Sequence, residues 1–288
     1  MISIIICSIS EKMLADVSYN IEKTIGVPYE IIAFDNSLGK KGICEVYNNG
    51  AKKAKFEILC FMHEDIAYET KDWGRLVLNI LSSDSTIGIV GIAGSSYKTI
   101  SQSGWFSGGS MKANYVNILQ RYKFEDRTAA INTNNPRNER MSQVAVIDGV
   151  WFCTKKSIVA EFPFDQETFK NFHCYDLDFS LSVTKKYKAV VTYDFLLEHF
   201  SEGNYNQQWI EETLLLHKKW QDMLPINLEN FSFKEQIFAE KHTFRFFLDQ
   251  MKLAGFSKKQ MLKTLNNSKL NRVSWMLFFK MYIEVLIK

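Results

Sequence analysis

The chain lacks the sequence features that mark several large protein classes. No stretch reaches the roughly 18 uninterrupted apolar residues that indicate a transmembrane helix. The opening residues, MISIIICS, have no basic flank, so we expect them to form a strand and not a signal peptide. The cysteines are odd in number and contain no C-x-x-C pair, which favours reduced, mostly buried thiols of a cytosolic protein. They are Cys7, Cys44, Cys60, Cys153 and Cys174.

Four common catalytic motifs are also absent. The sequence contains no G-x-x-x-x-G-K-[ST], no G-x-G-x-x-G after its first predicted strand, no H-E-x-x-H and no G-x-S-x-G. These absences disfavour P-loop, dinucleotide-binding, zinc-protease and α/β-hydrolase functions. The composition is that of an ordinary folded protein, with 46% hydrophobic and 23% charged residues in a chain of 288.

The formal charge of +3 is unevenly distributed along the chain. Residues 226–288 hold 11 Lys and Arg against 5 Asp and Glu, a formal charge of +6, whereas residues 1–225 carry −3. A neutral-to-acidic body argues against a protein that coats nucleic acid. With Pro225 as the boundary, we predict a main domain over 1–225 and a helical, basic and aromatic C-terminal extension over 226–288.

Short apolar runs alternate with helical patterns in the first hundred residues. This order predicts an α/β fold, with a mainly parallel sheet covered by helices. Residues 93–142 are rich in turn signals, and we expect a flexible loop there. After Pro225 we expect helices and no strand. The predicted strands are 2–7, 30–34, 56–62, 87–92, 144–153 and 189–193; the predicted helices are 10–24, 42–53, 72–81, 175–186 and 205–220.

Polar side chains follow the first three predicted strands. In parallel sheets, ligands bind beyond the carboxyl ends of the strands. Residues two apart on a strand face the same way, so His63 and Asp65 can converge on one ion or phosphate while Glu64 faces away. A solvated strand end is the alternative. Asp35 can accept hydrogen bonds from a ribose or base, or simply close an Asx-turn. Ser8 occupies the corresponding place after the first strand.

Three further residues are candidates for chemistry. Asp176 and Asp178 open a predicted helix, where N-capping explains at least one of them. An Asp at a cleft can also serve as a general base. His199 follows a predicted strand, and a lone His is more often a packing or surface residue. It becomes a candidate metal ligand if the chain returns it to the sheet edge that carries Asp65.

The order and spacing of these segments resemble the family 2 glycosyltransferases, which have the GT-A fold. ISIIICSIS and YEIIAFDNS are similar to the first two strands of the family, and VYNNGAKKAKFEILCFMHED is similar to the stretch that ends in its D-x-D motif. VIDGVWFCTKKSIVAEFPFDQETFKNFHCYDLDFSLSVTKKYKAVV resembles its acceptor-side segment. The likeness covers about residues 1–220. His63 replaces the first Asp of D-x-D, and Tyr175 replaces the Glu before Asp176. We assign a sequence with these variants to a bacterial sub-branch of the family.

The resemblance implies an inverting hexosyltransferase that moves a sugar from a nucleotide diphosphate, UDP ahead of others, to an acceptor hydroxyl. Asp176 falls on the general base of the family. Asp65 and His199 fall on metal ligands, with His63 as a further ligand or a contact to phosphate or ribose. An Asp/His set favours Mn²⁺ over Mg²⁺. The residues expected to contact donor or acceptor are Ser8, Asp35, Asn48, His63, Asp148 and Trp151, the last with core packing as an equal alternative.

Two other functions stay open at this stage. One is a sugar-nucleotide or glycan binder that has lost turnover, and the other is a sugar-phosphate nucleotidyltransferase, which the glycine-free CSISEKM segment disfavours. The resemblance implies a cytoplasmic enzyme of bacterial surface polysaccharide assembly, with a glycan or lipid-linked saccharide as acceptor. The C-terminal extension is expected to pack on the body or on a second subunit, with peripheral contact to the anionic inner membrane face as the alternative.

Overall fold

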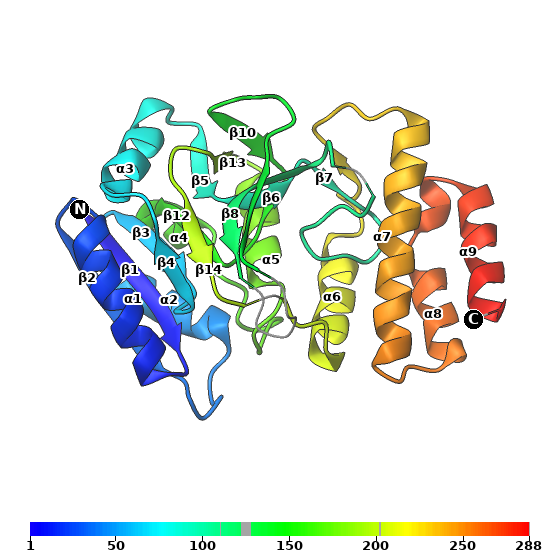
Figure 1. The fold of residues 1–288 in the computed structure, drawn as a ribbon. Coiled ribbons are helices and arrows are strands. Elements are labelled where there is room, and N and C mark those ends of the chain that lie inside the picture. The colour runs from blue at the N-terminus through cyan, green and yellow to red at the C-terminus, as the bar shows by residue number, and fades with distance from the viewer. Residues whose placement is uncertain (110, 122–127, 202, 288) are drawn as a thin grey trace. The chain divides into compact units, whose positions relative to one another are not determined.

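The computed structural model describes residues 1–109, 111–121, 128–201 and 203–287 (Figure 1). The chain forms two compact units. The first comprises Met1–Gly94 and Tyr115–Gly203, and the second comprises Ser95–Asn114 and Asn204–Lys288. The segment after residue 94 therefore folds with the C-terminal part of the chain.

A seven-stranded mixed sheet forms the centre of the first unit, in the order β10-β13-β5-β12-β3-β1-β2. Its pairings make five strands run in one direction, while β12 and β10 run in the other. The predicted α/β sheet, parallel over most of its strands, is therefore present. The strands are β1 (Ile2–Ser8), β2 (Tyr29–Asp35), β3 (Ile58–Met62), β5 (Ile87–Gly91), β10 (Met141–Val144), β12 (Trp151–Lys155) and β13 (Lys188–Thr192).

Helices with buried apolar residues cover this sheet. The Ser10 hydroxyl accepts a hydrogen bond from the backbone N–H of Met13 and so caps the first helix. Gly50 lets the second helix approach β1 closely, because a Cβ there would lie 2.4 Å from Cγ2 of Ile5. The helices of this unit are α1 (Glu11–Thr24), α2 (Ile43–Lys53), α3 (Trp73–Ser83), α4 (Lys156–Glu161) and α5 (Tyr175–Val183).

A second sheet, in the order β11-β6-β8-β14-β4 with β9 beside β8, corrects the prediction for residues 93–142. We expected turns and a flexible loop there, but much of the segment forms strands. Asn and Gly residues give it turn-like composition, and pairing with distant strands overrides that local signal. Residues 110 and 122–127 of the predicted loop lie outside the described residues. The strands are β4 (Ile66–Tyr68), β6 (Ala93–Ser95), β8 (Asn114–Gln120), β9 (Ala130–Asn134), β11 (Val146–Ile147) and β14 (Leu197–His199).

The second unit is largely helical, as the composition of the C-terminal extension predicts (Figure 1). The expected absence of strands after Pro225 is wrong in one place, because β15 (Ile226–Asn227) pairs antiparallel with β7 (Tyr97–Lys98). Among the helices that the structure describes, none is long and apolar enough to cross a membrane. The helices are α6 (Gln207–Trp220), α7 (Phe233–Leu253), α8 (Lys258–Asn267), the short 3-10 helix η1 (Leu270–Arg272) and α9 (Trp275–Ile287).

A buried polar network fixes the segment that follows β7. The ammonium group of Lys98 donates to the carbonyls of Ser103 (2.8 Å) and Gly104 (3.0 Å) and lies 3.2 Å from Nε2 of His217. The carboxylate of Glu240 accepts from the backbone N–H groups of Ile100 and Ser101, each at 2.9 Å. Burial, with the charge of Lys98, holds the pKa of His217 well below its usual range. His217 is therefore a neutral structural histidine.

Candidate metal and catalytic site

Strand pairing returns His199 to the place where Asp65 lies. His63 follows the last residue of β3, and β4 begins directly after Asp65. β14 runs antiparallel to β4, with His199 opposite Ile66. The backbone N–H of Phe200 donates to the carbonyl of Asp65 at 3.0 Å. The condition under which a lone histidine becomes a candidate ligand is therefore met.

The three side chains form a cluster that could hold a metal ion. One ligand atom from each of His63, Asp65 and His199 lies within 4.8 Å of the other two. Nδ1 of His63 is 3.8 Å from Oδ1 of Asp65, and Nε2 of His199 is 3.6 Å from Oδ2. The side chains retain 13 to 22% of their accessible surface, so an ion can reach them. Two imidazole nitrogens with a carboxylate oxygen fit a transition-metal ion such as Mn²⁺ better than Mg²⁺.

Asp65 is held in its ionised form. Burial alone would raise its pKa, but the neighbouring His63 and His199 and a 2.6 Å hydrogen bond from the Ser201 hydroxyl outweigh this effect and lower the pKa. A charged carboxylate is the form that binds a cation. The centre of the cluster is therefore prepared for a positive ion at neutral pH.

Glu64 faces the opposite way, as strand alternation predicts. Its carboxylate accepts hydrogen bonds from the Ser8 hydroxyl (2.6 Å) and from the backbone N–H groups of Ile9 (2.9 Å) and Ser10 (3.1 Å). Glu64 and Ser8 are both buried. Glu64 thus fixes the turn between β1 and α1, and the hydroxyl of Ser8 is engaged within the fold.

Asp176 lies in the first turn of α5, where it combines partial burial with an unusual pKa. Its carboxylate accepts a hydrogen bond from the backbone N–H of Leu177 at 2.9 Å. Burial, reinforced by the charge of Asp148, raises the pKa of Asp176 to about 7. A carboxylate with a pKa near neutrality is a more effective proton acceptor than an ordinary aspartate. Asp178 is buried in the same helix.

The other predicted contact residues have structural partners of their own. Asp35 is exposed and accepts from the backbone N–H of Ser37 at 2.9 Å, the Asx-turn alternative, and this bond lowers its pKa. Asp148 accepts from the N–H of Val150 at 2.8 Å. The amide of Asn48 donates to the carbonyl of Phe164 at 2.9 Å and accepts from its N–H at 3.1 Å, which ties α2 to a distant loop.

Trp151 is a core residue. Its side chain has no exposed surface, and its indole N–H donates to the hydroxyl of Tyr68 at 2.7 Å. Its ring packs edge-on against Trp73 with centroids 6.1 Å apart. A bound sugar has no face of this indole to stack on, so the packing alternative describes Trp151.

Three residues around the cluster were not assigned a role from the sequence. Tyr175 was noted only as a departure from the family pattern, yet its hydroxyl lies 3.0 Å from Nε2 of His63. Gln120 lies in the segment predicted as a loop, and its Oε1 is 3.3 Å from Nδ1 of His199. Ser201 follows His199 by two residues, and its hydroxyl donates to Oδ2 of Asp65 at 2.6 Å.

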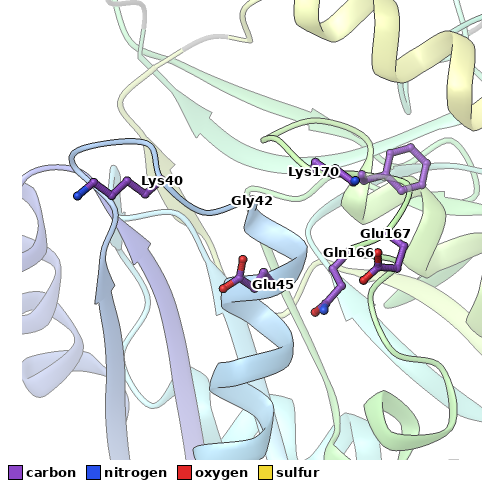
Figure 2. A pocket seen from close by; sticks show the side chains of 7 residues that line it. Lys40, Gly42, Glu45, Gln166, Glu167 and Lys170 are labelled. Atoms are coloured by element: carbon purple, nitrogen blue, oxygen red, sulfur yellow. The ribbon is translucent and has the colours of Figure 1, made fainter.

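A polar pocket of about 280 Å³ lies between the start of α2 and the loop after α4 (Figure 2). Lys40 and Glu45 contribute from one segment, and Gln166, Glu167 and Lys170 from the other. None of the residues that line it belongs to the metal cluster. The charges at its rim are mixed, and nothing in it resembles a catalytic pair.

Comparison with known proteins identifies the family. The sequence model described as "Glycosyltransferase like family" matches residues 3–223. The chain belongs to this family. The sequence-based prediction of a glycosyltransferase is thereby confirmed at family level, while the bacterial sub-branch stays a prediction. A search of curated protein sequences finds no significant match.

Solved structures support the GT-A fold of this glycosyltransferase. It resembles GalNAc-T7, crystallised with UDP, GalNAc and Mn²⁺, with a TM-score of 0.51 and 13% identity over 88% of this chain. It also resembles residues 1–349 of TarS from S. aureus, with a TM-score of 0.52 and 11% identity over 94% of this chain. The match spans 56% of the GalNAc-T7 chain and 82% of the TarS chain. At these identities the likeness shows the fold alone.

Proposed function

We propose that the protein is a metal-dependent, inverting glycosyltransferase that takes its sugar from a nucleotide diphosphate, with UDP as the nucleotide. The observation that carries the proposal is the convergence of His63, Asp65 and His199 within 4.8 Å of one another. Their site adjoins the start of α5, since His63 contacts Tyr175 and Asp176 is the next residue. The presence of UDP and Mn²⁺ in the GalNAc-T7 crystal supports the choice of donor and ion.

The chemistry divides between the cluster and Asp176. His63, Asp65 and His199 would hold a divalent ion, which would neutralise the charge that develops on the leaving diphosphate. Asp176 accepts the proton of the acceptor hydroxyl while the oxygen of that hydroxyl bonds to the anomeric carbon. The bond from that carbon to the diphosphate oxygen breaks in the same step. One displacement with one base inverts the configuration at the anomeric carbon.

The remaining predicted contacts fall into two groups. Asp35 is exposed at the end of β2, and the charge of Asp148 raises the pKa of Asp176, so we propose that they contact the nucleotide and a sugar hydroxyl, respectively. Ser8 and Asn48 contribute to the site indirectly. Ser8 bonds to Glu64, which holds the turn after β1, and Asn48 bonds to the backbone of Phe164 in the loop after α4. By its family, we infer that the enzyme extends a glycan or lipid-linked saccharide in surface polysaccharide assembly.

A sugar-nucleotide binder without turnover would share the fold and the cluster. The replacement of the first Asp of D-x-D by His63 is its best support. The pKa of about 7 at Asp176 favours an enzyme, because a binder has no use for a carboxylate that is costly to ionise. A nucleotidyltransferase has less support, since the turn after β1 lacks glycine and is filled by Glu64.

Calorimetry with Mn²⁺ and UDP, together with a transfer assay on UDP-, GDP- and dTDP-sugars, tests the proposal. We expect Asp65→Ala to abolish measurable Mn²⁺ binding, because it removes the only anionic ligand of the cluster. Asp84→Ala is the matched control, since Asp84 also has a lowered pKa but lies at the end of α3. Wild-type Mn²⁺ binding by Asp65→Ala would contradict the metal site, and a wild-type protein without turnover on any donor would favour the binder.

The C-terminal helix offers a surface for a partner. Residues Leu277, Met281 and Val285 bury one face of α9, which contacts α7, α8 and η1. The opposite face is apolar too, and its spacing makes a continuous stripe along the helix. Packing therefore covers only one side of α9. The residues of this exposed stripe are Trp275, Met276, Phe279, Ile283, Leu286 and Ile287.

We propose an anionic membrane surface as the partner of the stripe. Lys280 lies on α9 itself, and the ammonium group of Lys258 reaches the carbonyl of Leu286 at 3.1 Å. Residues 226–288 carry a formal charge of +6. Apolar side chains beside lysines are the composition of interfacial helices. A second copy of the chain is the alternative.

Co-sedimentation with vesicles separates these partners. We expect the full chain to pellet with phosphatidylglycerol-containing vesicles and not with phosphatidylcholine alone, and Phe279→Glu to lose this binding. Tyr19→Glu, which alters an exposed aromatic residue of the first unit, should keep it. The alternative outcome is that wild-type protein pellets with neither type of vesicle and that Phe279→Glu converts a dimer to a monomer in sedimentation velocity. In that case a second copy of the chain is the partner.

A further inference from the structure

The two departures from the family pattern lie in direct contact. His63 stands where the family has an Asp, and Tyr175 stands where it has a Glu, 112 positions later; Nε2 of His63 and the Tyr175 hydroxyl are 3.0 Å apart. A carboxylate presents ligand oxygens in any orientation, but a neutral imidazole has only one unprotonated nitrogen. A histidine at position 63 therefore binds a metal only if its proton is kept on the nitrogen that faces away from the ion.

The hydroxyl proton of Tyr175 is already committed. It is donated to the carbonyl oxygen of Gly149 at 2.9 Å, inside the protein. Gly149 permits this approach, because a Cβ there would lie only 2.2 Å from the hydroxyl oxygen. If the hydroxyl turned toward His63, the buried carbonyl would be left without this hydrogen bond, which is costly inside a protein. Tyr175 therefore accepts a hydrogen bond from Nε2–H of His63.

This arrangement leaves the lone pair of His63 on Nδ1, the atom that faces Asp65. The distance from Nδ1 to Oδ1 of Asp65 is 3.8 Å, too long for a hydrogen bond that would hold a proton between them. Nδ1 is the nitrogen of His63 that lies within 4 Å of Asp65, and is therefore the atom placed to bind an ion of the cluster. The contact with Tyr175 thus turns the replacement residue into a usable ligand.

A second contact does the same for His199. The side-chain NH₂ of Gln120 donates to the carbonyls of Arg121 at 2.5 Å and Ser201 at 2.8 Å, which fixes the orientation of the amide. Its Oε1 then faces Nδ1 of His199 at 3.3 Å and can only accept. The proton of His199 belongs on Nδ1, and the lone pair lies on Nε2, 3.6 Å from Oδ2 of Asp65.

We propose that Tyr175 and Gln120 are positioning residues that hold His63 and His199 in the tautomers required for metal binding, and that Tyr175 is the compensation for a histidine at position 63. The inference rests on the proposed metal-dependent function. It adds that the identities of residues 63 and 175 are coupled: a tyrosine hydroxyl is needed with His63 and is dispensable with an aspartate there. Outer partners of this kind typically change metal affinity about 10–100-fold.

The tautomers can be measured in the metal-free protein. Two-bond ¹H–¹⁵N correlation spectra of ¹⁵N-histidine-labelled wild-type protein should show His63 protonated on Nε2 and His199 on Nδ1. Tyr175→Phe should shift His63 away from its Nε2–H form and leave His199 unchanged. Tyr193→Phe is the matched control, because the Tyr193 hydroxyl also donates to a backbone carbonyl, that of Asn134, at 2.8 Å. Nδ1–H on His63 in wild-type protein would overturn the proposal.

Metal affinity gives the second readout. By calorimetry or Mn²⁺ electron paramagnetic resonance, we expect Tyr175→Phe to weaken Mn²⁺ binding about 10–100-fold. In a His63→Asp background, the same change should alter it less than about threefold, because an aspartate has no ring proton for Tyr175 to hold and coupled residues depart from additivity. Equal losses in both backgrounds would overturn the coupling. Gln120→Leu tests the His199 contact separately and remains informative if Tyr175→Phe fails to fold.

The outcomes keep the two proposals distinct. Wild-type protein that binds no Mn²⁺ but shows the expected tautomers would remove the metal-dependent function and leave the positioning contacts in place. Wild-type protein that binds Mn²⁺ with the opposite tautomer at His63 would do the reverse.

Discussion

Two groups of histidines differ in what surrounds their nitrogens. In the second unit, His217 is fully buried, with Nδ1 3.1 Å from the carbonyl of Ile100 and Nε2 accepting from the N–H of Ser103 at 3.0 Å. Both of its nitrogens are used by the fold. In the first unit, His63 and His199 use one nitrogen for a neighbour and direct the other toward Asp65.

This difference separates a structural histidine from a candidate ligand. Burial removes His217 from solvent and lowers its pKa, so it serves as a neutral acceptor. The two histidines of the cluster stay partly exposed beside an ionised carboxylate. A histidine with one nitrogen held and the other facing a charge is arranged for a cation. The four predictions that follow test whether sugar transfer, metal affinity and stability divide between the two regions in this way.

The largest effect is expected at Asp176, the proposed base next to the cluster. Asp176→Asn should lower the transfer rate about 100- to 10,000-fold, the usual contribution of a general base, while Mn²⁺ affinity stays unchanged. Rate measurements on the donor sugar found in the panel, with calorimetry in parallel, check both parts. A variant that transfers sugar at the wild-type rate would show that another group takes the proton.

The pKa of Asp176 fixes the sign of the pH dependence. Because the base must be ionised and its pKa is raised to about 7, the wild-type rate should fall as pH drops below 7. The raised pKa also means that ionising Asp176 destabilises the fold. The contribution of protonated Asp176 to the free energy of unfolding is fully present below the ordinary pKa of an aspartate. It is lost as pH rises through about 7. Asp176→Asn should therefore melt at a higher temperature than wild type at pH 8.

Two further predictions form a reciprocal pair. His199→Ala should weaken Mn²⁺ binding by about 100-fold or more, exceeding the loss from an outer partner. It should change the unfolding free energy less than His217→Ala does, because the His199 side chain retains 13% of its accessible surface and His217 retains 3%. His217→Ala should leave Mn²⁺ affinity intact but destabilise the protein by about 2–3 kcal/mol, because buried donors on Lys98 and Ser103 lose their acceptor.

Calorimetry and urea unfolding on the same two proteins measure both sides of this comparison. Comparable losses of Mn²⁺ affinity from both substitutions would show that the contrast between the two histidine environments has no functional meaning.

Much of this organisation follows from local rules in the sequence. The alternation of side chains along a strand places Glu64 opposite His63 and Asp65, and the structure shows Glu64 bound to the turn after β1. The capping serine of α1 and the β-α order of the first hundred residues are visible in the same way. These features depend on neighbours within a few positions.

The rest depends on pairings between distant segments. Gln120 lies on β8, whose sequence NYVNILQ has no clear alternation and sits beside Asn-rich β9. Its place next to His199 arises from the pairing of β8 with β14. Tyr175 is visible in the sequence as an odd residue, but its contact with His63 crosses 112 positions. The sequence favours a sugar contact and a core position equally for Trp151, and its complete burial in the structure identifies the core position.

The pairing of β4 with β14 has a consequence for the cohesion of the first unit. Ser201 and Asp65, joined by a hydrogen bond, are 136 positions apart in the chain. An ion bound between Asp65 and His199 would act as a reversible cross-link that closes this long loop, whose closure entropy grows only slowly with length. At an ion concentration 100 times its dissociation constant, such a link adds about 2.7 kcal/mol to the folded state. The supply of metal would then tune the resistance of this unit to unfolding as well as its activity.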